Sequence, residues 1–280
     1  MEKPVWRLLI DQDAPGNQNM AVDESILNHC LKLKRPTFRF YKWHPACLSL
    51  GYFQKVNEIN LSKCKNRGID VVRRPTGGRA VLHKNELTYS VIIPLEFLPG
   101  KLIETYKILS EALTEGLKKV GLNAVLSPVQ KKLNAESAAC FDAASSYEIK
   151  INGKKVIGSA QTRKGQALLQ HGSIPIFNYN QELVELLELP SDRGEKLYKI
   201  LEKKASTLSE EGLKINRETY LEDLIPLEDA IIKGFSETIG WDFEKGELTS
   251  EEREMVQNLS SEKYRKLEWK NEGRNSSATL

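Results

Sequence analysis

Hydrophobic and polar positions along the chain follow two different periods. From Leu87 to Ile93 every second residue is apolar, which indicates a strand with one buried face. Between Leu102 and Val120 apolar residues recur at steps of three and four, which is typical of an amphipathic helix, and Gly121 follows where that helix would end. The chain therefore contains both strands and helices.

The same periodicities predict the other elements. We expect Asn17 or Asn19 to cap the first helix, with Asp23 and Glu24 near its positive N-terminal end. Strands are not joined by regular β-α-β crossovers, which favours an α+β fold with mixed or antiparallel sheets flanked by helices. Further strands are predicted at residues 6–10, 37–43, 47–52, 71–74, 79–83 and 168–177, and helices at 17–33, 61–67, 181–189, 193–204, 226–239 and 250–267.

The helical segments beyond Asn180 are rich in charged residues. We predict one main domain over residues 1–245, followed by a charged C-terminal helix and tail over residues 246–280. A chain of 280 residues with 40% hydrophobic content is long enough to bury a full core without disulfides or metals.

Charge and hydropathy limit the partners and the location. The 41 basic and 38 acidic residues give a net charge of +3, which is too balanced for nucleic acid as the main partner. A small positive excess suits an acidic protein partner. No apolar run approaches the roughly 18–20 residues of a membrane span. The first residues carry an acid and no apolar stretch, so we expect no secretory signal and a cytoplasmic location.

The four cysteines, at positions 30, 47, 64 and 140, include no C-x-x-C pair, so a zinc cluster or a disulfide is not expected. Cys30 and Cys47 have apolar neighbours, which predicts burial, and Cys64 lies between lysines, which predicts exposure. The stretch from 127 to 139 has no apolar periodicity and is predicted to be a loop that leads to Cys140. Cys140 is therefore the candidate nucleophile, provided that a cation favours its thiolate.

A lysine pair supplies the candidate cation. Residues 147–151 and 154–161 flank Asn152-Gly153, a strong signal for a two-residue hairpin turn. This register pairs Lys155 with Lys150, and it turns Lys154 and Lys155 to opposite faces. Spacing alone leaves open which lysine faces a pocket, and both are also compatible with solvated charges at a hairpin tip.

Glycine and histidine residues mark other candidate site positions. The turn between Arg74 and Arg79 contains Gly77-Gly78, where a ligand can approach the main chain, although a lone Gly-Gly is more often only a turn. His83 and His171 are candidates for acid–base or polar pocket groups, although a lone histidine is usually structural.

Six segments in order resemble the lipoate- and biotin-attachment superfamily. The last three closely resemble the LipM group of octanoyltransferases, and the resemblance covers about residues 5–180. The segments are Asn19–Glu24, Leu48–Gln54, Arg73–His83, Cys140–Glu148, Gly153–Gln161 and Gln170–Ser173.

This resemblance implies the fold of a biotin/lipoate protein ligase catalytic domain and a specific reaction. An octanoyl group would move from octanoyl-acyl carrier protein to a lysine of the glycine cleavage H protein, or of another lipoyl domain, through a thioester on Cys140. Lys155 would lower the pKa of that thiol. No metal or other cofactor is needed, and we expect a monomer. The residues expected to bind substrate are Arg74, Gly77, Gly78, His83, Gly158, Ser159, His171 and Gly172.

The apolar strand over residues 87–93 is a hypothetical wall of the octanoyl slot. Two enzymatic alternatives remain: an amidotransferase that moves octanoyl or lipoyl groups between lipoyl domains, and an ATP-dependent lipoate-protein ligase. A carrier-protein binder without catalytic activity is a third.

Overall fold

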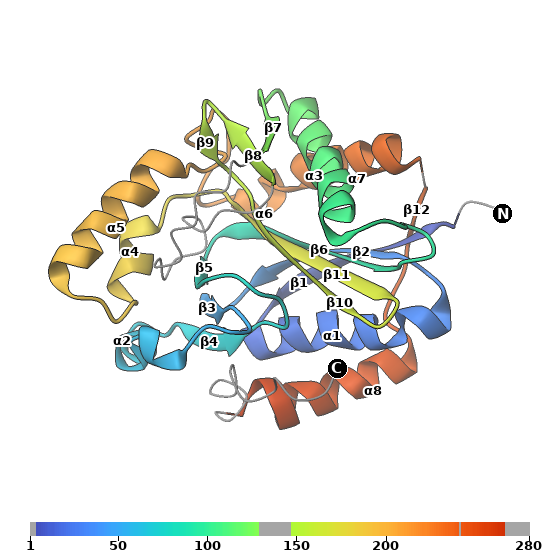
Figure 1. The fold of residues 1–280 in the computed structure, drawn as a ribbon, viewed down its shortest axis with the longest axis horizontal. Helices are drawn as coiled ribbons and strands as arrows, with labels where there is room; N and C mark the ends of the chain where they lie inside the picture. Colours follow the sequence, from blue (N-terminus) through green and yellow to red (C-terminus); the bar gives the residue numbers. More distant parts are fainter. Residues whose placement is uncertain (1–3, 129–146, 241, 267–280) are drawn as a thin grey trace.

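A computed structural model describes residues 4–128, 147–240 and 242–266 (Figure 1). The strands are β1 (Trp6–Ala14), β2 (Thr37–Trp43), β3 (Cys47–Leu50), β4 (Asp70–Arg73), β5 (Val81–His83), β6 (Glu86–Pro94), β7 (Val125–Pro128), β8 (Tyr147–Ile151), β9 (Lys154–Lys155), β10 (Gly158–Lys164), β11 (Ala167–Pro175) and β12 (Phe243–Lys245). The α-helices are α1 (Gly16–Leu33), α2 (Leu61–Asn66), α3 (Leu102–Lys119), α4 (Asn180–Glu185), α5 (Ser191–Lys204), α6 (Tyr220–Asp223), α7 (Ile225–Ile239) and α8 (Ser250–Leu259). Two further short helical segments are η1 (Val56–Glu58), a 3-10 helix, and η3 (Ser260–Tyr264), a π-helix.

Three sheets organise these elements. The largest has six strands in the order β10-β11-β6-β2-β1-β12, in which β1 runs parallel to β2 and β12 while the other neighbours are antiparallel. Strands β4, β3 and β5 form a second sheet, and β7, β8 and β9 a third. Mixed and antiparallel sheets with flanking helices confirm the predicted α+β class.

Helices cover both faces of the large sheet, with α3 and α7 on one side and α1 and α8 on the other (Figure 1). Leu87, Tyr89, Val91 and Ile93 of β6 pack in the same core as the apolar residues of α3, including Leu109 and Leu113. The alternate residue Ile92 packs with Met20 and Ile26 of α1. All nine residues of β6 are therefore buried.

Between these cores, β6 carries polar side chains on its α1 face. Thr88 and Ser90 are buried there, and cross-strand pairing places them beside Ser173 and His171 of β11. Buried polar groups need hydrogen-bond partners, so this face is where a polar site is expected.

The C-terminal helices pack against α1 rather than standing apart from it. Glu252 of α8 is fully buried and accepts two hydrogen bonds of 2.7 Å from Arg7 of β1. Glu24 of α1 accepts hydrogen bonds from Lys263 and Tyr264. The boundary predicted at residue 245 stays a prediction.

Several local expectations need correction. The first helix begins at Gly16 after Pro15, with no side-chain cap, so Asn19 lies inside the helix and is buried. Asp23 is also in the interior of the helix, and its role is not to complement the helix dipole. Cys64 is 1% exposed, because its neighbouring lysines point elsewhere on α2 while its own side chain packs in the core.

The predicted loop was wrong at its start, since residues 127 and 128 belong to β7, which pairs with β8. The rest of that stretch lies outside the described residues. Helix α6 and strand β12 were not predicted. Among the helices that the structure describes, none combines the length and the apolar character needed to cross a membrane.

Candidate active site

A pocket opens between the large sheet and the small β4-β3-β5 sheet. Its walls enclose about 350 Å³ of atom-free space, including space open to solvent. Six of the eight residues expected to bind substrate line it, namely Arg74, His83, Gly158, Ser159, His171 and Gly172. Apolar and aromatic side chains complete the wall, among them Met20, Tyr41, Trp43 and Val81.

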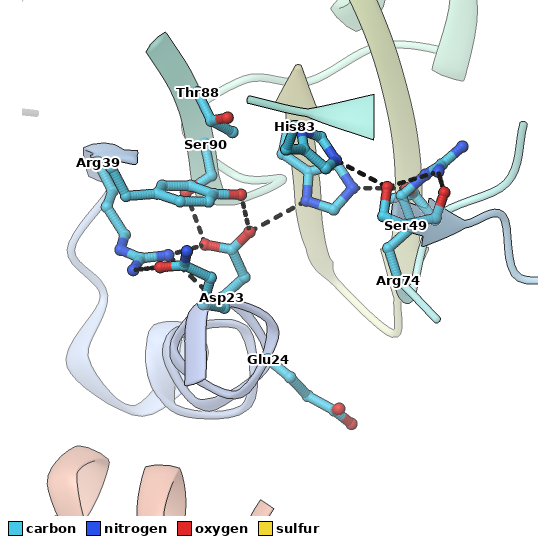
Figure 2. A network of polar contacts seen from close by, with 12 residues as sticks. Asp23, Glu24, Arg39, Ser49, Arg74, His83, Thr88 and Ser90 are labelled. Carbon is cyan, nitrogen blue, oxygen red and sulfur yellow. Dashed lines mark hydrogen bonds and ion pairs between the residues drawn. The ribbon is translucent and has the colours of Figure 1, made fainter. Parts of the chain in front are cut away.

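Asp23 stands at the centre of one polar network beside this pocket (Figure 2). One carboxylate oxygen accepts hydrogen bonds from Arg39 (2.8 Å) and Ser90 (2.9 Å). The other accepts from the Tyr41 hydroxyl and pairs with His171 Nδ1, both at 3.0 Å. Glu24, the next residue, points away from this network.

The charge states of this network follow from its geometry. Burial disfavours the carboxylate of Asp23, but the hydrogen bond from His171 and the charge of Arg39 outweigh it, so the pKa of Asp23 is lowered. Burial lowers the pKa of His171 despite the neighbouring carboxylate. His171 is therefore neutral near pH 7, with Nδ1 donating to Asp23 and Nε2 accepting a hydrogen bond of 2.6 Å from Thr76.

We expect Asp23→Ala to destabilise the protein by about 3–5 kcal/mol, because it leaves the buried Arg39 guanidinium and His171 without their shared partner. Asp11→Ala removes a second, partly exposed partner of Arg39 and is the control, with an expected loss of about 1 kcal/mol. Denaturant unfolding measures both. Equal losses for the two variants would contradict this assignment.

Asp23 also contributes a defined pH dependence. Because its pKa is lower in the folded state, its contribution to stability is fully present above the unfolded value of about 3.9 and is lost as pH falls through the folded value. Acid titration of stability should therefore show a shallower loss for Asp23→Ala than for the parent.

His83 belongs to a second network on the other side of the pocket. Its Nδ1 lies 2.7 Å from Glu86 Oε1, its Nε2 lies 2.7 Å from Ser49 Oγ, and its ring stacks on Trp43 at 4.1 Å. Glu86 also accepts hydrogen bonds from Thr88 and Ser173. The histidine is thus held by three neighbours, and it lines the pocket.

Arg74 shapes the glycine turn rather than only presenting a charge. It donates to the main-chain oxygens of Ser49, Gly77 and Arg79 at 2.7–3.0 Å. Gly77 and Gly78 are not among the residues that line this pocket, and Gly78 lines a separate surface hollow with Phe53. Their role in substrate binding stays a prediction.

Gly172 lies where two side chains meet across its backbone. A Cβ there would lie 2.6 Å from Tyr89 Cε1 and 2.8 Å from Ser159 Oγ, and these two residues share a hydrogen bond of 2.7 Å. A Cβ on Gly77 would meet nothing within 4 Å.

This contrast makes a matched prediction. Gly172→Ala should cost about 1–3 kcal/mol of stability through overpacking, whereas Gly77→Ala should stay within about 1 kcal/mol of the parent. Denaturant unfolding compares them. A loss of stability in Gly77→Ala together with unchanged stability in Gly172→Ala would contradict the close packing around Gly172.

The hairpin has the predicted register, with Lys155 opposite Lys150 and Lys154 opposite Ile151. Lys155 is 4% exposed, and its Nζ lies 3.6 Å from Glu148 Oε1, while Lys154 is only half-buried. The strand ends at Lys155, so the predicted alternation fails beyond it and both Val156 and Ile157 enter the core. Cys140 lies outside the described residues.

The slot hypothesis for residues 87–93 is wrong in its choice of side chains. Leu87, Tyr89, Val91 and Ile93 fill the core under α3, and β6 contributes Thr88 to the pocket. Sequence reasoning also missed the site roles of Asp23, Arg39, Thr76 and Glu86. Charged and hydroxylated residues inside apolar stretches, as at Arg39 and Thr88, were the available signal.

In the part of the chain that the structure describes, no group of three or more His, Cys, Asp or Glu residues is arranged to hold a metal ion.

Comparisons with known proteins place this architecture. Residues 15–226 match the family model described as the lipoyl protein ligase A/B catalytic domain. The chain is 43% identical over 272 residues to the octanoyltransferase LipM of Clostridioides difficile, covering 94% of this chain and 97% of that protein. It is 40% identical over 280 residues to the octanoyltransferase LipM of Geobacillus kaustophilus, covering 96% and 99%.

Comparison with solved structures supports the same family for the fold. A bipartite lipoate protein ligase from Thermoplasma acidophilum superposes with a TM-score of 0.79 at 25% identity, covering 99% of this chain and 100% of that one. Lipoate-protein ligase A bound with ATP gives 0.76 at 25% identity, covering 95% and 98%. The chain therefore belongs to the lipoyl protein ligase A/B catalytic domain family and, within it, to the LipM group of octanoyltransferases.

Proposed function

We propose that the protein transfers an octanoyl group from octanoyl-acyl carrier protein to a lysine of the glycine cleavage H protein, through an acyl-thioester on Cys140. Membership of the LipM group gives the coarser statement, an acyltransferase of lipoate biosynthesis. The donor, the acceptor and the thioester are parts of the proposal.

The observation that carries the proposal is the composition of the pocket. It brings together Arg74, His83, Gly158 and His171 from segments up to 97 residues apart, next to an apolar wall that includes Met20 and Trp43. Each methylene of an acyl chain buried against such a wall contributes about 0.8 kcal/mol. Lys155 precedes Gly158 of this pocket by three residues and carries a buried ammonium group.

The proposed mechanism has two half-reactions. The Cys140 thiolate attacks the octanoyl thioester, forming a new C–S bond while the carrier thiol leaves. The acceptor amine then attacks the acyl-Cys140 carbonyl, forming the amide and releasing the cysteine. Lys155 favours the thiolate and the oxyanion through its charge. Because a thioester is a more reactive acyl donor than an amide, the transfer needs no ATP.

Intact-mass measurement tests this proposal. Incubation with octanoyl-acyl carrier protein should add one octanoyl mass to the enzyme, and addition of the H protein should move that mass to the H protein without ATP. Absence of both mass shifts would refute the proposal.

The same assay separates the alternatives. Release of AMP from ATP and free octanoate would identify a ligase, and transfer from an octanoylated lipoyl domain alone would identify an amidotransferase. Carrier binding without any acyl-enzyme would identify a binding protein.

A further inference from the structure

A second pocket adjoins the first and shares part of its wall. It encloses about 500 Å³ of atom-free space, again including space open to solvent, between β5, β11, α4 and the residues after α5. Val81 and Ser173 line both pockets. His83 lines the first pocket and Glu86 the second, so their hydrogen-bonded pair spans the wall between them.

This second pocket also borders the strand that carries Lys155. Ser206, which lines it, donates its main-chain N–H to the Lys155 carbonyl oxygen at 2.9 Å, and Ala205 forms a bridge with Lys155. A substrate group in this pocket therefore lies beside the first pocket and close to the main chain of Lys155.

Glu86 contributes a buried carboxylate to the wall of this pocket. Glu86 is 4% exposed, and its hydrogen-bond partners among the described residues are His83 and the neutral hydroxyls of Thr88 and Ser173. Lys84, in the same wall, already binds both carboxylate oxygens of Glu182. Burying a carboxylate without a permanent cationic partner costs free energy, which favours the binding of a positively charged substrate group.

Two further carboxylates contact residues that line the pocket. Asn180 donates to Glu202 and Ser206 donates to Glu210. Arg217 stacks on Phe177, which lines the pocket, and Lys84 is paired with Glu182.

We propose that the second pocket admits the acceptor lysine side chain and that Glu86 binds its ammonium group. This inference rests on the proposed function, and it identifies the pocket through which the second substrate, the acceptor lysine, enters. The ammonium gives one proton to the Glu86–His83 pair, and the neutral amine forms a C–N bond with the acyl carbon. As the C–S bond breaks, the departing sulfur takes the second proton from nitrogen, leaving an amide and a thiol.

Other titratable groups near Glu86 do not compete for this role. Burial raises the pKa of Tyr41 on β2 and of Tyr220 on α6, and the charge of Glu86 adds to the increase, so both phenols stay neutral. His83 is the acid–base partner that contacts Glu86 directly, and Lys84 is held by Glu182.

The test measures the two half-reactions separately in Glu86→Gln, which keeps the shape and removes the charge. Acylation by octanoyl-acyl carrier protein in a single turnover should stay within about twofold of the parent, while transfer to the acceptor lysine should fall about tenfold or more. Transfer to hydroxylamine, an amine already neutral at pH 7, should stay within about twofold. Glu185→Gln, at an exposed ion pair with Arg67, is the control.

Two results would overturn the inference: equal loss in both half-reactions, or loss with hydroxylamine as large as with lysine. If Glu86→Gln does not fold, Asn180→Arg provides the second test. A cation at this lining residue should raise the KM for the acceptor about fivefold or more by charge repulsion, without slowing acylation. An unchanged acceptor KM would reject the pocket. Failure of the parent itself to be acylated would instead reject the proposed function.

Discussion

Replacing Cys140 with serine is expected to abolish the acyl-enzyme and to lower octanoyl transfer by about a thousandfold or more, because a serine hydroxyl at neutral pH lacks the nucleophilicity of a thiolate. After incubation with octanoyl-acyl carrier protein, mass spectrometry should show one octanoyl adduct on the parent, removed by hydroxylamine, and none on Cys140→Ser.

The other cysteines provide the control. Burial raises the pKa of Cys64, and it raises the pKa of Cys30 to about 12, so both thiols are poorly ionised at neutral pH. Cys64→Ser should therefore be acylated like the parent. An adduct that persists in Cys140→Ser and disappears in Cys64→Ser would identify Cys64 as the acylated nucleophile.

Lys155→Ala is expected to shift alkylation of Cys140 by iodoacetamide to higher pH and to slow transfer at least about tenfold, the factor that 1.4 kcal/mol represents. Loss of a buried ammonium raises the pKa of a nearby thiol, since the thiolate loses its stabilising charge. Glu148, which lies 3.6 Å from Lys155, keeps its contact with Lys150 in this variant.

Lys154→Ala is the matched control on the same hairpin. Its side chain is only half-buried, so its removal should cost less than about 1 kcal/mol and leave the alkylation profile of Cys140 in place. A shifted profile in Lys154→Ala with an unshifted one in Lys155→Ala would place the catalytic cation on the other face of the hairpin.

Local signals predicted those parts of the molecule that depend on neighbours in the chain. The two-residue turn at Asn152-Gly153 determines that Lys155 lies opposite Lys150, because such a turn leaves one register for the two strands. The apolar period between Leu102 and Val120 likewise predicted α3, which ends at Lys119, within a residue of its observed end.

Local signals failed where burial depends on distant segments. Cys64 looked exposed between lysines, yet successive residues on a helix point in different directions, and only the packing of α2 decides which one is buried. Strand β12 was missed because its three residues are stabilised by parallel pairing with β1, more than 230 positions away.

The sequence by itself determined the class of fold, the lysine register and the set of candidate pocket residues, since periodicity, turn chemistry and motif resemblance are all readable along the chain. Only the tertiary structure decided how these residues meet. Asp23 contacts Arg39 and His171 from separate elements, and Glu86 lies in the wall between two pockets. Such contacts join residues far apart in sequence, so the packing of α1 and β5 around β6 and β11 determines them and no local pattern encodes them.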